Sequence, residues 1–134
     1  MKFVFYVIVL ALVGFTGCTK DTSVDTSAAD LVGNWEWVKS SGGIAGVIQT
    51  PQTLGYTYHV TYTKDGRYLQ YDKDGKLAYD EAYVVSRANS ILDNKERDMV
   101  TLDASTMFSF TIRNDSLFLY QEAYDGINVT FVKK

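Results

Sequence analysis

The chain has few of the residues that build covalent or metal-based sites: of its 134 residues, one is cysteine, one is histidine and one is proline. A single cysteine excludes an internal disulfide, and a single histidine excludes a histidine-rich metal centre. Gly-x-Ser-x-Gly is absent as well, so the sequence offers no nucleophile and base pair. We therefore expect neither an enzyme nor a bound cofactor.

Positive charge is also scarce. Lys and Arg number 13 against 16 Asp and Glu, which gives a formal net charge of −3. Because no basic cluster is present to neutralise a phosphate backbone, nucleic acid is not an expected partner. The longest apolar run, residues 3–13, has eleven residues, and a membrane-spanning helix needs about 20.

The N-terminus has the parts of an export signal. Lys2 is followed by the apolar run and then by small residues before Cys18, which is the order of a secretory signal. The stretch 15–18, Phe-Thr-Gly-Cys, resembles the lipobox of bacterial lipoproteins, with Phe15 in place of the usual leucine. The resemblance implies cleavage after residue 17 and a membrane anchor of acyl chains on Cys18. An ordinary signal peptide with an unmodified cysteine is the alternative.

Residues 18–30 are rich in Ser, Thr and Asp, too polar to bury a core, and we expect a flexible tether. No Asp directly follows Cys18, which resembles an outer-membrane address. The expected organisation is therefore a lipoprotein signal at 1–17, a lipidated cysteine and tether at 18–30, and a folded domain at 31–134. The domain would face the periplasm or the cell surface.

The folded domain has the pattern of an all-β protein. Tyr and Val alternate with Thr and His over residues 56–63, which is the period of a half-buried strand. Asp-Gly at 65–66 and at 74–75 indicates hairpin turns. Only residues 27–31 suit a short helix. The expected strands are 33–40, 56–63, 68–72, 77–87, 99–102, 107–112, 116–121 and 127–132.

Eight antiparallel strands in a row leave two free edges unless the sheet closes on itself. Eight is also the number at which a barrel interior holds side chains or one small ligand. The sequence therefore predicts an eight-stranded antiparallel up-and-down barrel.

Five motifs, in this order, resemble the small lipocalin-like domains of Bacteroidetes lipoproteins. They are Leu-x-Gly-x-Trp at 31–35, Ser-Gly-Gly at 41–43, Asp-Gly-Arg-Tyr at 65–68, Asn-Asp-Ser-Leu at 114–117 and Tyr-Asp-Gly at 124–126. The resemblance implies that Trp35 packs in the core across the closed end of a lipocalin-like barrel. The Thr-Asp-Tyr loop and the last-strand arginine of animal lipocalins are absent, so their ligand chemistry is not carried over.

The alternation also predicts which side chains fill the barrel. The inward set is Tyr56, Tyr58, Val60, Tyr62, Phe108, Phe110, Leu117, Leu119, Val129 and Phe131. Aromatic side chains bury about 150–250 Å² each, so they would fill most of the interior. Any pocket is then confined to the mouth of the barrel.

Two functions fit these observations. In the first, a small apolar or amphipathic molecule binds at the mouth, against Tyr58, Val60, Phe108 and Phe110 and against Ile44 and Ile48. The last two belong to the long segment 41–55, which is a lid or a simple surface loop. In the second, the barrel is a protein-interaction or inhibitor module that presents its loops to another envelope protein. A cavity below about 300 Å³ favours the second function.

The stretch 70–81 places acidic residues at some positions of a calcium-binding EF-hand loop. Gln70 stands where the first Asp belongs, and the flanking segments alternate like strands. A hairpin explains Asp74-Gly75 without a metal ion, so no metal site is expected.

Overall fold

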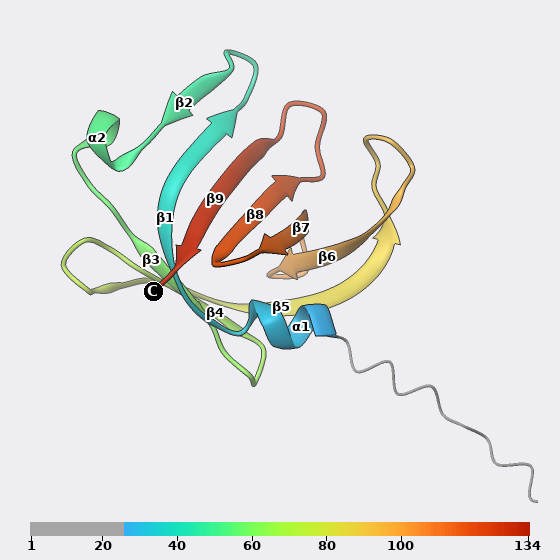
Figure 1. Ribbon diagram of the computed structural model, residues 1–134, viewed down its shortest axis with the longest axis horizontal. Coiled ribbons are helices and arrows are strands. Elements are labelled where there is room, and N and C mark those ends of the chain that lie inside the picture. Colours follow the sequence, from blue (N-terminus) through green and yellow to red (C-terminus); the bar gives the residue numbers. More distant parts are fainter. Residues whose placement is uncertain (1–25) are drawn as a thin grey trace, which may run out of the picture.

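The computed structural model describes residues 26–134, which form one antiparallel sheet with two short helices, α1 (Thr26–Leu31) and α2 (Pro51–Leu54) (Figure 1). The strands are β1 (Gly33–Gly42), β2 (Val47–Gln49), β3 (His59–Tyr62), β4 (Arg67–Tyr71), β5 (Leu77–Asn89), β6 (Glu96–Leu102), β7 (Thr106–Arg113), β8 (Ser116–Gln121) and β9 (Ile127–Lys133). The expected signal 1–17 and Cys18 lie outside the described residues. Neither described helix is long and apolar enough to cross a membrane.

The sheet closes into a barrel through β1. Its strand order is β2-β1-β3-β4-β5-β6-β7-β8-β9, and β1 pairs with β9 as well. All strands except β2 therefore form a closed antiparallel barrel of eight strands, in which neighbours in sequence are neighbours in space. This confirms the predicted architecture. The additional strand β2 pairs with the last residues of β1, from Ser40 to Gly42.

The segment between β1 and β3 is more regular than a plain loop. It contains β2 and then α2, a single helical turn with a complete set of end signals. The Thr50 hydroxyl accepts from the Thr53 amide, the Thr53 hydroxyl accepts from the Thr50 amide, and Pro51 starts the helix. Gly55 ends it in the left-handed conformation that favours glycine.

The barrel interior is filled by the predicted face of the strands. Val60, Tyr62, Phe110, Leu117, Leu119 and Phe131 are buried in one hydrophobic cluster, with Tyr58, Phe108 and Val129 packed against it. Tyr56 is the exception, since 48% of it is exposed. Four further residues that were not in the predicted inward set, Trp37, Tyr68, Val100 and Leu102, belong to the same cluster. The face assignment is therefore confirmed for all the predicted residues but Tyr56.

Helix α1 is attached to the core next to the start of β1. Leu31 and Trp35 are fully buried, and the Trp35 indole N–H donates to the Leu31 carbonyl oxygen at 2.8 Å. The Lys133 ammonium lies 5.7 Å from the centre of the Trp35 ring, a cation–π distance. Residues 26–30, the end of the expected tether, thus belong to a helix, and α1 lies at the opposite end of β1 from the β1–β2 hairpin (Figure 1).

The tyrosines at the centre of the barrel differ in how their hydroxyls are satisfied. Tyr62 packs edge-on against Tyr68 and Tyr83, and its buried hydroxyl has no hydrogen-bond partner among the described residues. Tyr83, by contrast, donates to the Thr63 carbonyl oxygen at 2.7 Å. Burial raises the pKa of the Tyr62 phenol well above its usual value, so this hydroxyl stays protonated.

We expect Tyr62→Phe to leave the free energy of unfolding unchanged or to raise it by up to about 1 kcal/mol, because an unpaired buried hydroxyl is removed. Tyr83→Phe should lower it by about 1 kcal/mol, because a hydrogen bond is lost. Urea unfolding of the two variants measures both effects. Equal losses in the two variants would show that the Tyr62 hydroxyl has a partner.

Candidate functional site

A pocket of about 430 Å³ opens at the end of the barrel where β3 begins and β4 ends. It lies between the segment that leads into β3 and the β4–β5 hairpin. The residues that line it are Tyr56, Thr57, Tyr58, Gln70, Asp72, Lys73, Asp74 and Ala78. Its volume falls within the range of about 300–1,000 Å³ that is usual for small-molecule sites.

One wall of this pocket is aromatic. The ring of Trp37 stacks with Tyr58 at 5.0 Å between centroids and 17° between planes, and with Tyr56 at 6.2 Å and 22°. Trp37 is buried and its indole N–H donates to the Ser40 hydroxyl at 2.9 Å, so the stack has a fixed base. Burial raises the pKa of the Tyr58 phenol well above its usual value. Tyr58 is therefore a neutral side chain with a hydroxyl proton.

The rest of the lining is polar apart from Ala78. The side-chain oxygen of Gln70, Oε1, accepts from the Tyr68 hydroxyl at 2.8 Å. The side-chain nitrogen of Gln70 donates to none of the described residues. The Thr57 hydroxyl oxygen is buried and has no hydrogen-bond partner among the described residues. Lys73 and Asp74 form an exposed ion pair at 2.7 Å.

Asp72, which also lines the pocket, stabilises the neighbouring turn. Its Oδ1 accepts from the amides of Lys76 and Asp74, both at 2.9 Å. The Lys76 amide, followed by the Asp74 amide and nearby lysines, holds the pKa of the Asp72 carboxyl below its usual value. This carboxylate stabilises the β4–β5 turn, whose Gly75 has the positive φ of 77° that the turn requires.

The structure brings only one of the predicted ligand-binding residues to this pocket. Tyr58 lines it, whereas Val60 and Phe110 are buried in the core and Phe108 packs against the core. Ile44 and Ile48, which are 95% and 57% exposed, lie on the β1–β2 hairpin and do not line it.

Sequence reasoning missed Thr57, Gln70, Asp72, Lys73, Asp74 and Ala78 as pocket residues. The available signal was the Asp-Gly turn at 74–75, which fixes where the hairpin ends. That turn lies close to the same end of β3, but the alternation pattern alone does not show that a space remains between them.

A smaller pocket of about 220 Å³ adjoins the first and shares Thr57, Tyr58, Asp72 and Lys73 with it. Its other lining residues are Glu36, His59, Gly75 and Lys134. His59 stacks on Tyr71 at 4.9 Å. Among the residues that the structure describes, no three His, Cys, Asp or Glu side chains are grouped as metal ligands.

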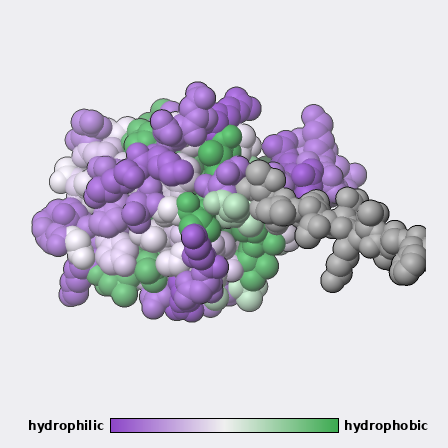
Figure 2. Space-filling model, turned by 60° about the horizontal axis from the view of Figure 1, so that its bottom comes forward, coloured by the Kyte–Doolittle hydropathy of each residue, from purple (hydrophilic) through white to green (hydrophobic). Residues whose placement is uncertain are grey.

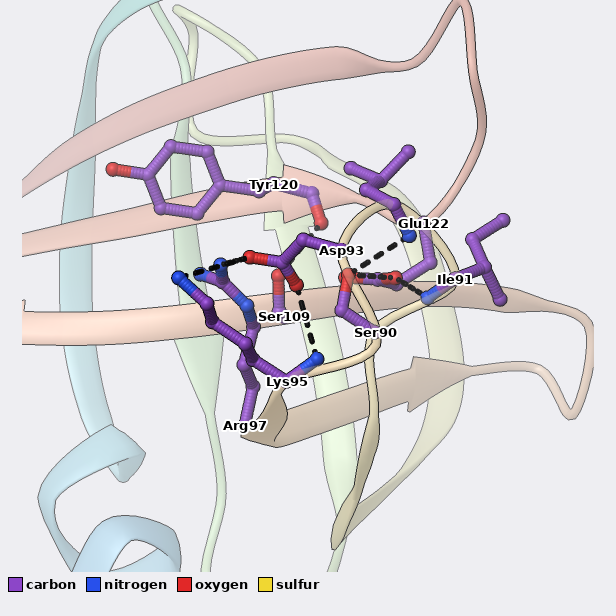
Figure 3. Close-up of polar contacts among 9 residues, drawn as sticks. Ser90, Ile91, Asp93, Lys95, Arg97, Ser109, Tyr120 and Glu122 are labelled. Carbon is purple, nitrogen blue, oxygen red and sulfur yellow. Dashed lines mark hydrogen bonds and ion pairs between the residues drawn. The ribbon is translucent and has the colours of Figure 1, made fainter.

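A second polar cluster lies on the outer face of β7 and β8 (Figure 3). The Ser90 hydroxyl and the Ile91 amide donate to Oε2 of Glu122 at 2.8 and 2.9 Å. Asp93 accepts from Arg97 at 2.6 Å. These bonds hold the β5–β6 loop, residues 90–95, against the barrel wall. Oε1 of Glu122 and Nε of Arg97 are buried without a hydrogen-bond partner among the described residues. Because the bonds that are made join the loop to the barrel, we assign this cluster to stability.

Glu122 makes this attachment dependent on pH. Partial burial opposes ionisation of Glu122, but the nearby Ser109 hydroxyl, the hydrogen bonds from Ser90 and the Ile91 amide, and the charge of Arg97 lower its pKa below the ordinary 4.5. Its contribution to stability is therefore complete above pH 4.5 and is lost as the pH falls through the lower folded-state value.

We expect Glu122→Gln to be less stable than the unchanged protein at pH 7, and the difference to shrink as the pH falls below 4.5. Ser90→Ala removes one donor to this carboxylate and so brings its folded-state pKa closer to the ordinary value, which should make the loss of stability in acid smaller and complete it at a higher pH than in the unchanged protein. Urea unfolding at several pH values measures both effects. A difference that does not change with pH would contradict this role of Glu122.

Comparison of the chain with models of known protein families gives no match, and a search of curated proteins gives none.

Proposed function

We propose that the protein is a lipid-anchored lipoprotein of the outer membrane whose lipocalin-like barrel binds a small amphipathic molecule at its mouth. The observation that carries the binding role is the pocket of about 430 Å³. It combines an aromatic wall, Tyr56 and Tyr58 on Trp37, with two groups for which the described residues provide no hydrogen-bond partner, the Thr57 hydroxyl and the amide nitrogen of Gln70. A ligand with an apolar face and a polar edge can stack on the aromatic rings and form hydrogen bonds with the polar groups.

The packing of the barrel supports a ligand at the mouth. Trp35, Tyr62 and Phe131 are the largest fully buried side chains. They belong to the hydrophobic core that fills the interior of the barrel. A calyx deep inside the barrel would require these side chains to leave the core. The open pocket requires no such change, because it is formed outside this packed layer.

The anchor on Cys18 fits the position of α1. Cys18 precedes Thr26, the first residue of α1, by 26 − 18 = 8 positions, and a chain of this length reaches at most about 26–29 Å. Helix α1 lies at the end of β1 that is opposite to the β1–β2 hairpin (Figure 1). A membrane anchor would then leave this hairpin directed away from the attached membrane.

Mass spectrometry tests the anchor. Expressed with its full sequence in a bacterium, the protein is expected to lose residues 1–17 and to gain the mass of acyl chains. Cys18→Ala should abolish the added mass and leave the protein out of the membrane fraction. If the Cys18→Ala variant has the same added mass as the protein with Cys18, the anchor is refuted.

The neutral amphipathic fluorophore N-phenyl-1-naphthylamine tests the pocket. We expect its emission to rise on binding, and Ala78→Trp, which places a large side chain in the pocket wall, to reduce this rise. Ala82→Trp is the matched control, because Ala82 is exposed on the same strand and does not line the pocket. Equal signals from the two variants would count against binding at this pocket.

The packed interior also favours a second candidate, a protein-interaction or inhibitor module. Ile44 and Tyr124, which are 95% and 90% exposed, belong to two adjoining loops, joined by a hydrogen bond from the Gly43 amide to the Gly126 carbonyl oxygen. On the face shown in Figure 2, hydrophilic side chains predominate and the hydrophobic ones form small separate patches. Binding of an envelope protein that is lost in Ile44→Asp, with no small-molecule binding, would support this module.

A further inference from the structure

We infer that the pocket takes a neutral saccharide, with the flat face of a pyranose ring on Tyr56 and its hydroxyl groups toward Gln70 and Thr57. This inference rests on the proposed function, which requires only that the pocket bind a small amphipathic molecule. It adds the chemical class of the ligand, and three properties of the pocket support it.

The first property is an aromatic platform with one open side. Tyr56 is 48% exposed, and its ring is held nearly parallel to the buried Trp37. The face of an aromatic ring carries partial negative charge. It therefore attracts the C–H groups that line one face of a pyranose, whose carbon atoms bear partial positive charge from their oxygens. A rigid platform loses little side-chain entropy when a ring stacks on it.

The second property is the mixture of donors and acceptors beside this platform. Gln70 offers two amide N–H donors, since its oxygen already accepts from Tyr68. The Thr57 hydroxyl, which both donates and accepts, is buried and reaches a ligand when its side chain turns, and this turn breaks no hydrogen bond to a described residue. A sugar hydroxyl also donates and accepts, so it can pair with each of these groups. An alkyl chain would bury the Gln70 amide without a partner and leave the Thr57 hydroxyl unpaired, which is unfavourable.

The third property is the balance of charge. Asp72 and Asp74 place two carboxylates in the pocket wall, and Lys73 lies between them in sequence and pairs with Asp74. The carboxylates repel an anionic ligand, and the lysine reduces the attraction for a cationic one. A neutral polyol is not repelled by the carboxylates and does not depend on attraction to them. The volume of about 430 Å³ leaves room for one or two sugar rings.

Calorimetric titration of the full chain tests the inference with cellobiose, lactose, mannobiose and N,N′-diacetylchitobiose. The neutral alcohol 1-hexanol serves as the probe for a simple amphipathic ligand. At about 10 mM a site with a Kd of about 1 mM is nearly saturated, so weak binding is detected. We expect at least one disaccharide to bind.

Variants then locate the site. Tyr56→Ala should weaken disaccharide binding about tenfold, which corresponds to the loss of one aromatic contact. Gln70→Leu should weaken it several-fold, because two donors are lost. Tyr124→Ala removes a tyrosine that is 90% exposed and does not line the pocket, and should leave binding unchanged. Thermal unfolding of each variant checks that the fold is retained.

The outcomes separate this inference from the proposed function. Binding of 1-hexanol with no disaccharide binding would overturn the saccharide and leave the mouth pocket as a binding site. If none of the five compounds binds, both the saccharide inference and the proposed binding function are overturned. Disaccharide binding that survives both Tyr56→Ala and Gln70→Leu would overturn the placement in this pocket.

Discussion

Replacing Gly42 with alanine is expected to lower the free energy of unfolding by about 2–5 kcal/mol. Gly42 has a φ of +132°, which side chains other than glycine rarely adopt. A Cβ atom there would lie 2.4 Å from the Gly126 carbonyl oxygen and 3.1 Å from the Ile127 Cα. Both contacts are with backbone, so no side-chain rotation relieves them. Urea unfolding measures the loss.

The position of Gly42 explains why the effect should be large. It pairs with Val47 of β2 on one side and with Ile127 of β9 on the other. Displacing it therefore strains the β1–β2 hairpin and the closing pair of the barrel together. A barrel that opens between β1 and β9 exposes two sheet edges, so the variant should also aggregate more readily during unfolding.

Gly43→Ala is the matched control. Gly43 has a φ of +72°, but a Cβ atom there would meet nothing within 4 Å. The backbone conformation alone should cost about 1–2 kcal/mol. Equal losses at both positions would mean that backbone strain dominates and that the close approach to Gly126 is unimportant.

The fold was predictable from the sequence because alternation and turn chemistry agree over most of the domain. Asp-Gly at 65–66 and 74–75 lies in the turns that precede β4 and β5. The strand expected at 99–102 begins earlier, at Glu96, since Arg97 and Asp98 pair with β5 although they are polar. β2 has three residues, too few for a period to be visible.

The pocket was less predictable than the fold. Strand parity places Val60 and Phe110 inside the barrel, but it does not say which inward side chains remain uncovered. Tyr56 and Asp74 line the same pocket although 18 positions separate them (74 − 56). Their proximity depends on how β4 and β5 tilt and on the bulge in their pairing between Gln70 and Tyr71. Neither is encoded in a local pattern.

Trp35→Ala is expected to produce the other large effect, a loss of about 3–5 kcal/mol in the free energy of unfolding. Trp35 is fully buried in the core. The variant loses its apolar contacts and leaves a cavity that neighbouring strands fill only in part. It also leaves the Leu31 carbonyl oxygen without the indole donor at 2.8 Å. Urea unfolding by circular dichroism measures the loss.

Trp37→Ala distinguishes loss of packing from loss of the α1 attachment. Trp37 is buried to nearly the same degree, but its indole donates to Ser40 and its ring stacks on Tyr58. Both variants should lose stability, whereas only Trp35→Ala should release α1. Hydrogen exchange of the amides at 28–31 would then accelerate in Trp35→Ala beyond what its lower global stability explains. Equal acceleration in both variants would show that α1 is held by the barrel as a whole and does not depend on the bond between Trp35 and Leu31.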